Sequence, residues 1–238
     1  SAPYSSGQYN VAVGYQALTA FTTADKCVAI GYGAGKVHTT SAWSVYIGYK
    51  AGYDVTSGAQ NVLIGGEAGT NLTTADRNIA IGGAALQTAT IGDSNVAVGD
   101  NAGWSATTAS GSVFIGRLAA GSLTTGNDNI AIGRDALNGA AVTGDSNIAI
   151  GVSALDAQTG GDNCIAIGLN AGGSSYGVDN VIGIGAYAAH NGLGAGTIAI
   201  GYYAGYYSQT ANNTFVGYES GKGTGAAGYG NSTGLGYQ

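Results

Sequence analysis

The chain has 238 residues, including 45 Gly and a single Pro, and its 7 basic and 13 acidic side chains give a net charge of −6. Because seven Lys and Arg side chains are too few to neutralise a phosphate backbone, we expect no nucleic-acid partner. One Pro without a Gly-x-y period excludes collagen. The lack of a run of about 20 apolar residues predicts no membrane insertion.

The first residues, Ser1 to Tyr4, contain no initiator Met and no apolar signal-peptide core. We interpret them as a processed or trimmed start, which is consistent with export from the cell.

The dominant feature of the sequence is an internal repeat. Short phrases of the form Asn-x-Ala-Ile/Val-Gly recur and end on a glycine that we call the corner glycine. The steps between corner glycines are 17 residues up to Gly133 and 16 to 18 residues from there to Gly217. The corner glycines are Gly14, Gly31, Gly48, Gly65, Gly82, Gly99, Gly116, Gly133, Gly151, Gly168, Gly185, Gly201, Gly217 and, in a degenerate last copy, Gly236. These 14 copies predict a single repeat array over residues 1–238, with regular coils over about 8–221 and a Gly-rich degenerate final coil over 222–238.

A short strand is predicted directly before each corner glycine, because β-branched residues occupy the first and third of three positions. In the regular copies the strands are expected at 11–13, 28–30, 45–47, 62–64, 79–81, 96–98, 113–115, 130–132, 148–150, 165–167, 182–184 and 198–200. One repeat cannot bury its branched side chains alone, but stacked repeats can. We therefore predict an all-β fold, a parallel β-solenoid of about 14 coils spaced about 4.8 Å apart, with the branched side chains pointing into the coil.

The middle residue of each strand is then expected to point outward. It is apolar in nearly every copy, and in the first nine copies it is Ala12, Ala29, Tyr46, Leu63, Ala80, Ala97, Phe114, Ala131 and Ala149. Such a stripe is too large to leave in water, so either another part of the same coil or another chain covers it. We favour other chains and predict a candidate self-association face along this column.

Two further columns predict ladders that run from coil to coil. Directly after the corner glycine, six copies carry a tyrosine: Tyr15, Tyr32, Tyr49, Tyr202, Tyr218 and Tyr237. This column is either a strip that binds a carbohydrate or another surface, or a cross-strand ladder that stabilises the solenoid. Four residues before the corner glycine, Asn or Ser predicts a ladder of hydrogen-bonded amides.

The two cysteines also belong to that Asn/Ser column. Cys27 and Cys164 lie eight coils apart, which is about 38 Å at the expected spacing of stacked strands. Because the Cα atoms of a disulfide lie within about 7 Å of each other, we predict no disulfide within the chain.

We expect no catalytic, cofactor-binding or metal-binding residues. His38 and His190 lack Cys or carboxylate partners at metal-ligand spacing. Aspartates recur in the turns, at Asp25, Asp76, Asp93, Asp145, Asp162 and Asp179. We interpret them as turn residues, with a calcium-binding edge as the alternative. The chain is therefore predicted not to be an enzyme.

The segment Asn10-Val11-Ala12-Val13-Gly14-Tyr15-Gln16-Ala17-Leu18 resembles the repeats of phage tail-fibre proteins. It is also similar to the head domains of bacterial trimeric autotransporter adhesins. The resemblance extends over residues 8–238, and it implies a left-handed parallel β-roll in which three chains pack side by side. It also implies a protein of the cell exterior, the cell surface or the virion.

Our functional hypothesis is a non-enzymatic structural or adhesive fibre protein that assembles with copies of itself as a homotrimer. One alternative is a subunit that stacks end to end into a filament. A further alternative is a glycan- or ice-binding solenoid, because Thr pairs such as Thr22-Thr23 and Thr73-Thr74 recur in the turns. A cell-surface glycan or protein is the candidate partner besides the chain itself.

Overall fold

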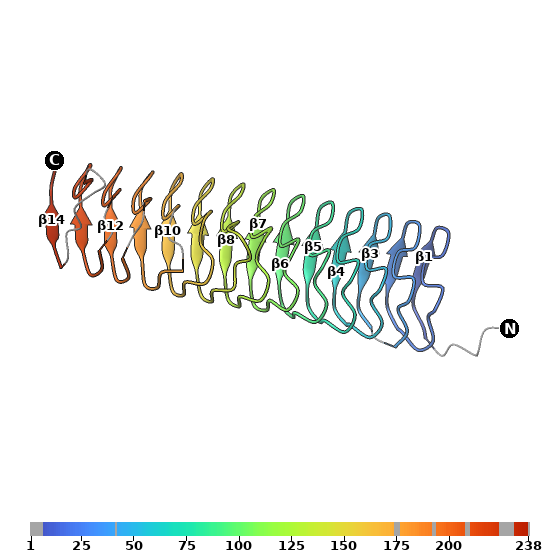
Figure 1. Cartoon of the computed structure of the whole chain (residues 1–238). Coiled ribbons are helices and arrows are strands. Elements are labelled where there is room, and N and C mark those ends of the chain that lie inside the picture. Colours follow the sequence, from blue (N-terminus) through green and yellow to red (C-terminus); the bar gives the residue numbers. More distant parts are fainter. Residues whose placement is uncertain are drawn as a thin grey trace. The chain divides into compact units, whose positions relative to one another are not determined.

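A computed structural model describes residues 7–40, 42–173, 177–191, 194–207, 210–223 and 231–237. Within these ranges the regular secondary structure consists of three-residue strands, one per repeat (Figure 1). They are β1 (Val11–Val13), β2 (Val28–Ile30), β3 (Val45–Ile47), β4 (Val62–Ile64), β5 (Ile79–Ile81), β6 (Val96–Val98), β7 (Val113–Ile115), β8 (Ile130–Ile132), β9 (Ile148–Ile150), β10 (Ile165–Ile167), β11 (Ile182–Ile184), β12 (Ile198–Ile200), β13 (Thr214–Val216) and β14 (Thr233–Leu235). The proposed processed start at residues 1–4 and much of the Gly-rich final coil, residues 224–230 and 238, lie outside the described residues.

The coils group into two compact units, Ser1–Arg117 and Leu118–Gln238, which we describe separately. The first unit contains β1 to β7 and the second β8 to β14. Within each unit every strand pairs in parallel with the next strand of the chain, residue for residue, as Val45 with Val62 in the first unit and Ile165 with Ile182 in the second. The predicted all-β parallel β-solenoid is therefore confirmed. The single array over residues 1–238 and the left-handed sense of the coil stay predictions.

Two constraints favour glycine at the corner position, and both apply at Gly99. Its φ of +139° lies in a region that side chains rarely adopt. A Cβ atom there would also stand 2.6 Å from the carbonyl oxygen of Gly116 in the next coil. Because the corners stack backbone on backbone, the same close approach recurs along the stack, as between Gly65 and Gly82.

The orientation that we predicted for the strands is wrong. From β2 to β12 the middle residue is fully buried inside the coil, and the two β-branched residues point outward. The predicted self-association face is therefore an interior column, fully buried at Ala29, Tyr46, Leu63, Ala80, Ala97, Phe114, Ala131 and Ala149. Ala12 is exposed because β1 has no preceding strand.

The physical reason for this orientation is the small width of the coil. The Ala three residues after the corner glycine is fully buried in every coil from Ala34 to Ala204, so no larger side chain occupies this interior position. Glycines make room for the two largest interior side chains: Gly52 lies in the same coil as Tyr46, and Gly103 lies in the coil before that of Phe114. A Cβ atom on Gly52 would lie 2.5 Å from the ring of Tyr46, and a Cβ atom on Gly103 would lie 2.6 Å from the ring of Phe114.

In some coils the opposite wall carries a large residue and the strand carries alanine. In the coils of Ala80, Ala131 and Ala149, the position four residues after the corner glycine is a buried leucine. These leucines are Leu86, Leu137 and Leu155. In these three coils the strand and the opposite wall thus carry side chains of complementary size.

The predicted amide ladder is confirmed. Asn78 Oδ1 accepts a hydrogen bond from the backbone N–H of Asn95 at 3.0 Å, and Asn78 Nδ2 donates to the carbonyl of Gly92 at 2.9 Å. Asn61 Oδ1 accepts from the N–H of Asn78 at 2.9 Å in the same way. Each buried amide thus joins its coil to the next one, which fixes the stacking register.

The cysteines occupy this ladder as buried thiols, not as disulfide partners, as predicted. Burial raises the pKa of the Cys27 and Cys164 thiols. The Cys27 Sγ atom lies 3.5 Å from His38 Nε2, and His38 Nδ1 lies 3.1 Å from the Tyr46 hydroxyl. This chain of polar groups is fully buried, so it is part of the core of the first unit.

Candidate functional site

The outward-pointing β-branched residues form a continuous apolar surface in each unit, which we call the outer face. It consists of the first and third residue of every strand. In the first unit these are Val11, Val13, Val28, Ile30, Val45, Ile47, Val62, Ile64, Ile79, Ile81, Val96, Val98, Val113 and Ile115. The exposed fraction is 39% at Ile30 and 38% at Ile81 in this unit, and 37% at Ile167 and Ile200 in the second. In the described strands no charged residue occupies either column.

Two rows of exposed residues border the outer face. We call the row five residues before the corner glycine the leading rim, and the row directly after the corner glycine the trailing rim. Burial alternates along the segment between them, as in the coil of β3, where Ser44 and Tyr46 are buried while Trp43 and Tyr49 are 59% and 51% exposed. The outer face and its rims therefore form one surface four columns wide.

The tyrosines of the trailing rim stack from coil to coil, as the ladder interpretation predicted. The ring centroids of Tyr15, Tyr32 and Tyr49 are 5.5 Å apart at each step, with interplanar angles of 25° and 19°. In the second unit Tyr202, Tyr218 and Tyr237 stack at 5.2 Å. Because these rings turn their faces to one another, they offer edges and hydroxyl groups to a ligand. A surface-binding strip along Tyr15, Tyr32, Tyr49, Tyr202 and Tyr218 stays a prediction.

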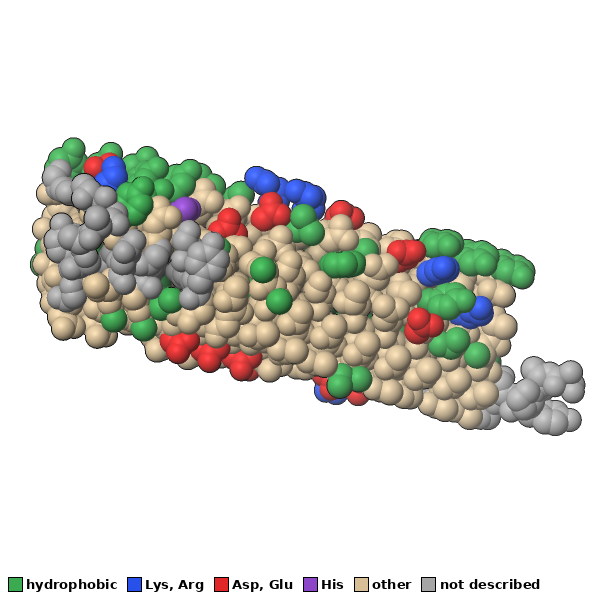
Figure 2. Space-filling model, in the orientation of Figure 1, with side chains coloured by type: hydrophobic (Ala, Val, Ile, Leu, Met, Phe, Trp, Pro, Cys, Tyr) green, Lys and Arg blue, Asp and Glu red, His purple; other side chains and the backbone are tan. Residues whose placement is uncertain are grey.

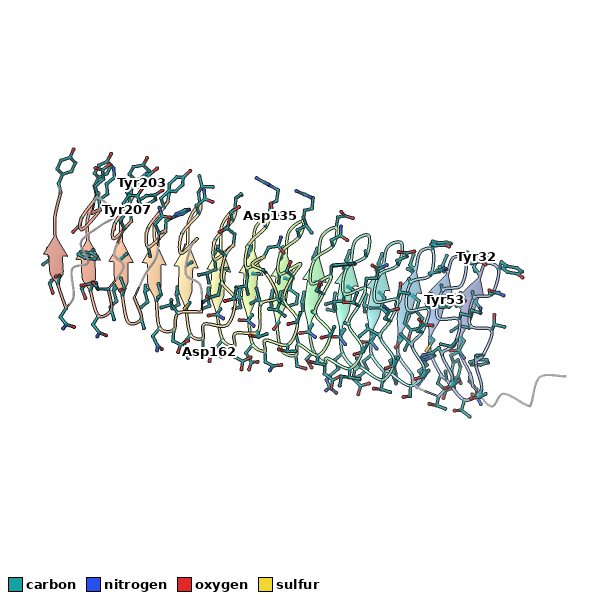
Figure 3. All side chains as sticks on the ribbon, viewed as in Figure 1. Tyr32, Tyr53, Asp135, Asp162, Tyr203 and Tyr207 are labelled. Atoms are coloured by element: carbon teal, nitrogen blue, oxygen red, sulfur yellow. The ribbon has the colours of Figure 1, made fainter. Side chains whose placement is uncertain are left out.

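Sequence reasoning missed an aromatic cluster on the turns of the second unit, two and five residues after the corner glycine. Tyr187 stacks on Tyr203 at 4.8 Å, and His190 stacks on Tyr206 at 5.2 Å. Figure 3 shows Tyr203 and Tyr207 along one edge of the ribbon. The recurrence of aromatic residues at these positions of successive repeats, as at Tyr187 and Tyr203, could have predicted this cluster from the sequence.

Lysines accompany the aromatic residues of the first unit. Lys36 Nζ donates a hydrogen bond to the Tyr53 hydroxyl at 2.6 Å and lies 4.8 Å from the ring centroid. This hydrogen bond raises the pKa of Lys36. On the leading rim, Lys26 Nζ lies 4.1 Å above the ring of Trp43. These contacts hold positive charge against aromatic surface.

The Thr and Asp columns are used mainly for internal bonding. The Thr22 hydroxyl donates to the carbonyl of Thr39, and the Thr73 hydroxyl donates to that of Thr90. Asp162 Oδ1 accepts the N–H of Asp145 at 2.8 Å, which fits the interpretation as turn residues. Figure 2 shows one face of the molecule, on which uncharged polar surface predominates and charged side chains gather toward the edges.

Among the described residues, no group of three or more His, Cys, Asp and Glu is placed to hold a metal ion. The same residues include no helix long and apolar enough to span a membrane. Comparison with family models, curated proteins and solved structures finds no match to this chain.

Proposed function

We propose that the chain is a non-enzymatic structural subunit of an extracellular or virion fibre, and that it assembles with copies of itself through the outer face. The observation that carries the proposal is the pair of outward-pointing Val and Ile columns, which are interrupted in the described strands only by Thr214, Thr233 and Leu235. Scattered exposed apolar residues are normal on a protein surface, but a contiguous apolar patch marks an interaction site.

The size of the outer face supports a second copy as its occupant. The transfer energy of a Val or Ile side chain corresponds to about 60–120 Å² of apolar surface, so the fourteen Val and Ile residues of the first unit, about one-third exposed, leave roughly 300–550 Å². This area matches the roughly 300–600 Å² of the largest apolar patch on a typical monomeric protein, which is often an interaction site. The lack of charge in the two columns favours an equally apolar partner, which the outer face of another copy supplies.

The test places charges on this surface without touching the core. We expect Ile81→Glu combined with Ile167→Glu to dissociate the assembly into folded monomers, because the interface would bury unpaired carboxylates. The matched control is Thr74→Glu with Thr125→Glu, which adds the same charge at exposed turn positions. Light scattering measures the mass, and circular dichroism checks the fold.

The possible outcomes separate the proposal from its alternatives. Discrete oligomers in the wild type and the control, with monomers in the outer-face variant, support side-by-side assembly. Long filaments that persist in the outer-face variant would contradict it and indicate end-to-end stacking. A monomeric wild type would also contradict it, and would direct attention to glycan binding.

A further inference from the structure

We propose that the aromatic cluster of the second unit is a site of oxidative modification, at which a one-electron oxidant, such as the oxidised haem of a peroxidase, couples the rings of Tyr203 and Tyr206 into a dityrosine. The inference goes beyond the proposed function, because the reaction takes place within one chain and does not use the outer face. It is carried by the arrangement of these two rings and by the composition of the second unit.

Tyrosine is the readily oxidised side chain that such an oxidant reaches in the second unit. The chain contains no Met, and its two tryptophans, Trp43 and Trp104, belong to the first unit. Cys164 is the one cysteine of the second unit, and it is buried as a thiol whose pKa burial raises. Cysteine oxidation follows thiolate character and exposure, so this thiol is protected. Tyr203 and Tyr206, in contrast, are partly exposed.

The rings of Tyr203 and Tyr206 are placed for coupling. The two residues lie three positions apart on the turn after β12, with ring centroids 4.7 Å apart and an interplanar angle of 48°. Such a tilted pair can meet along the ring edges, which carry the carbon atoms next to the hydroxyl group. Tyr187 stacks on Tyr203 at 4.8 Å, and His190 stacks on Tyr206 at 5.2 Å. These two partners hold the pair in position.

The other ring contacts are less suited to coupling. The stacked tyrosines of the trailing rim turn their faces to one another, with interplanar angles between 14° and 26°. Paired strands hold their coils about 4.8 Å apart, so the ring edges of neighbours run side by side instead of meeting. Tyr202 meets Tyr203 at 72°, with the edge of one ring toward the face of the other. Tyr206 and Tyr207 meet at 88° in the same way.

The coupling removes two electrons and two protons in total. Each phenol gives one electron to an equivalent of the oxidant and releases its hydroxyl proton to the solvent. The two phenoxyl radicals then form one C–C bond between ring carbons next to the oxygen atoms. Each joined carbon loses its proton and each oxygen takes one up, which restores both phenols. Hydrogen peroxide, which regenerates the oxidised haem, accepts the two electrons and two protons and becomes water.

Oxidation of the folded chain tests the site. The wild type is treated with a haem peroxidase and limiting hydrogen peroxide, and single chains are then separated from linked chains by size under denaturing conditions. Dityrosine fluorescence is measured in the single-chain fraction. Tyr203→Phe and Tyr206→Phe each keep a ring but remove one phenol. The matched control is Tyr218→Phe, which removes a stacked tyrosine of the trailing rim in the same unit. Circular dichroism checks that every variant is folded.

We expect wild type and Tyr218→Phe to form similar amounts of dityrosine, and Tyr203→Phe and Tyr206→Phe each to lose most of it. The modified wild-type chain should be lighter by two hydrogen atoms, with tandem mass spectrometry placing the bond between Tyr203 and Tyr206. Unchanged fluorescence in Tyr203→Phe, an equal loss in Tyr218→Phe, or dityrosine only between chains would overturn the site. An equal single-chain yield after unfolding in urea would also overturn it, because the folded arrangement would then be unnecessary.

Discussion

The inner and outer sides of the same strands differ in how much their residues vary from coil to coil. Inside the coil the middle residue varies from Ala80 to Tyr46, and a glycine such as Gly52 makes room for the larger residue. On the outside, Val and Ile repeat with little variation. The contrast indicates that the residues of the interior differ from coil to coil, whereas the outer face is a uniform apolar surface.

The largest expected effect comes from emptying the interior. Phe114→Ala should lower the free energy of unfolding by about 3–5 kcal/mol, because the narrow coil cannot close the cavity. Adding Gly103→Leu should recover part of this loss, since leucines occupy the equivalent position where the strand carries alanine, as Leu86 does. Denaturant unfolding measures both variants, and an additive loss in the double variant would contradict the size complementarity.

Breaking the amide ladder should have the next largest effect. Asn78→Ala leaves the N–H of Asn95 and the carbonyl of Gly92 without their buried partner, which costs about 2–3 kcal/mol. Asn78→Ser should cost less, because the Ser44 hydroxyl accepts the N–H of Asn61 in the same column. Equal unfolding curves for the two variants would show that the amide makes no specific contribution.

The buried tyrosine predicts a pH dependence. Burial raises the pKa of the Tyr46 hydroxyl above its usual value of about 10. The unfolded chain releases this proton near pH 10 while the folded chain retains it, so stability from this group is complete below pH 10 and falls as the pH rises further. We expect Tyr46→Phe to show a smaller loss of stability between pH 9 and pH 11 than the wild type, as followed by urea unfolding. Parallel pH profiles would contradict this prediction.

The smallest expected effect on folding comes from the outer face. Val62→Thr keeps the β-branched shape at a partly exposed position, so the free energy of unfolding of the isolated chain should change by about 0.5 kcal/mol or less. Dilute samples are needed, because association would add to the measured stability. A loss like that expected for Phe114→Ala would place Val62 in the core.

The sequence was sufficient to predict the strands, the amide ladder and the absence of a disulfide, because each depends on a spacing. It did not decide which side of each strand faces the interior, because apolar residues occupy both sides. Exchanging the two sides of a strand leaves its alternating pattern unchanged. The deciding signal was the coupling of Tyr46 to Gly52 and of Ala80 to Leu86, which appears only when two columns are compared. The predicted self-association face was therefore assigned to the middle residues of the strands instead of the outward-pointing Val and Ile residues.

Two neighbouring substitutions test the orientation of the strands most directly. Ala80→Glu places a carboxylate in the fully buried interior, whereas Ile81→Glu places it on the outer face at a residue 38% exposed. Because an unpaired buried charge is costly, we predict that Ala80→Glu unfolds the first unit or lowers its melting temperature strongly. In samples dilute enough for every variant to be monomeric, Ile81→Glu should melt close to the wild type. Thermal melting followed by circular dichroism decides between them. A folded Ala80→Glu variant together with an unfolded Ile81→Glu variant would contradict this orientation and would show that the β-branched residues point into the coil.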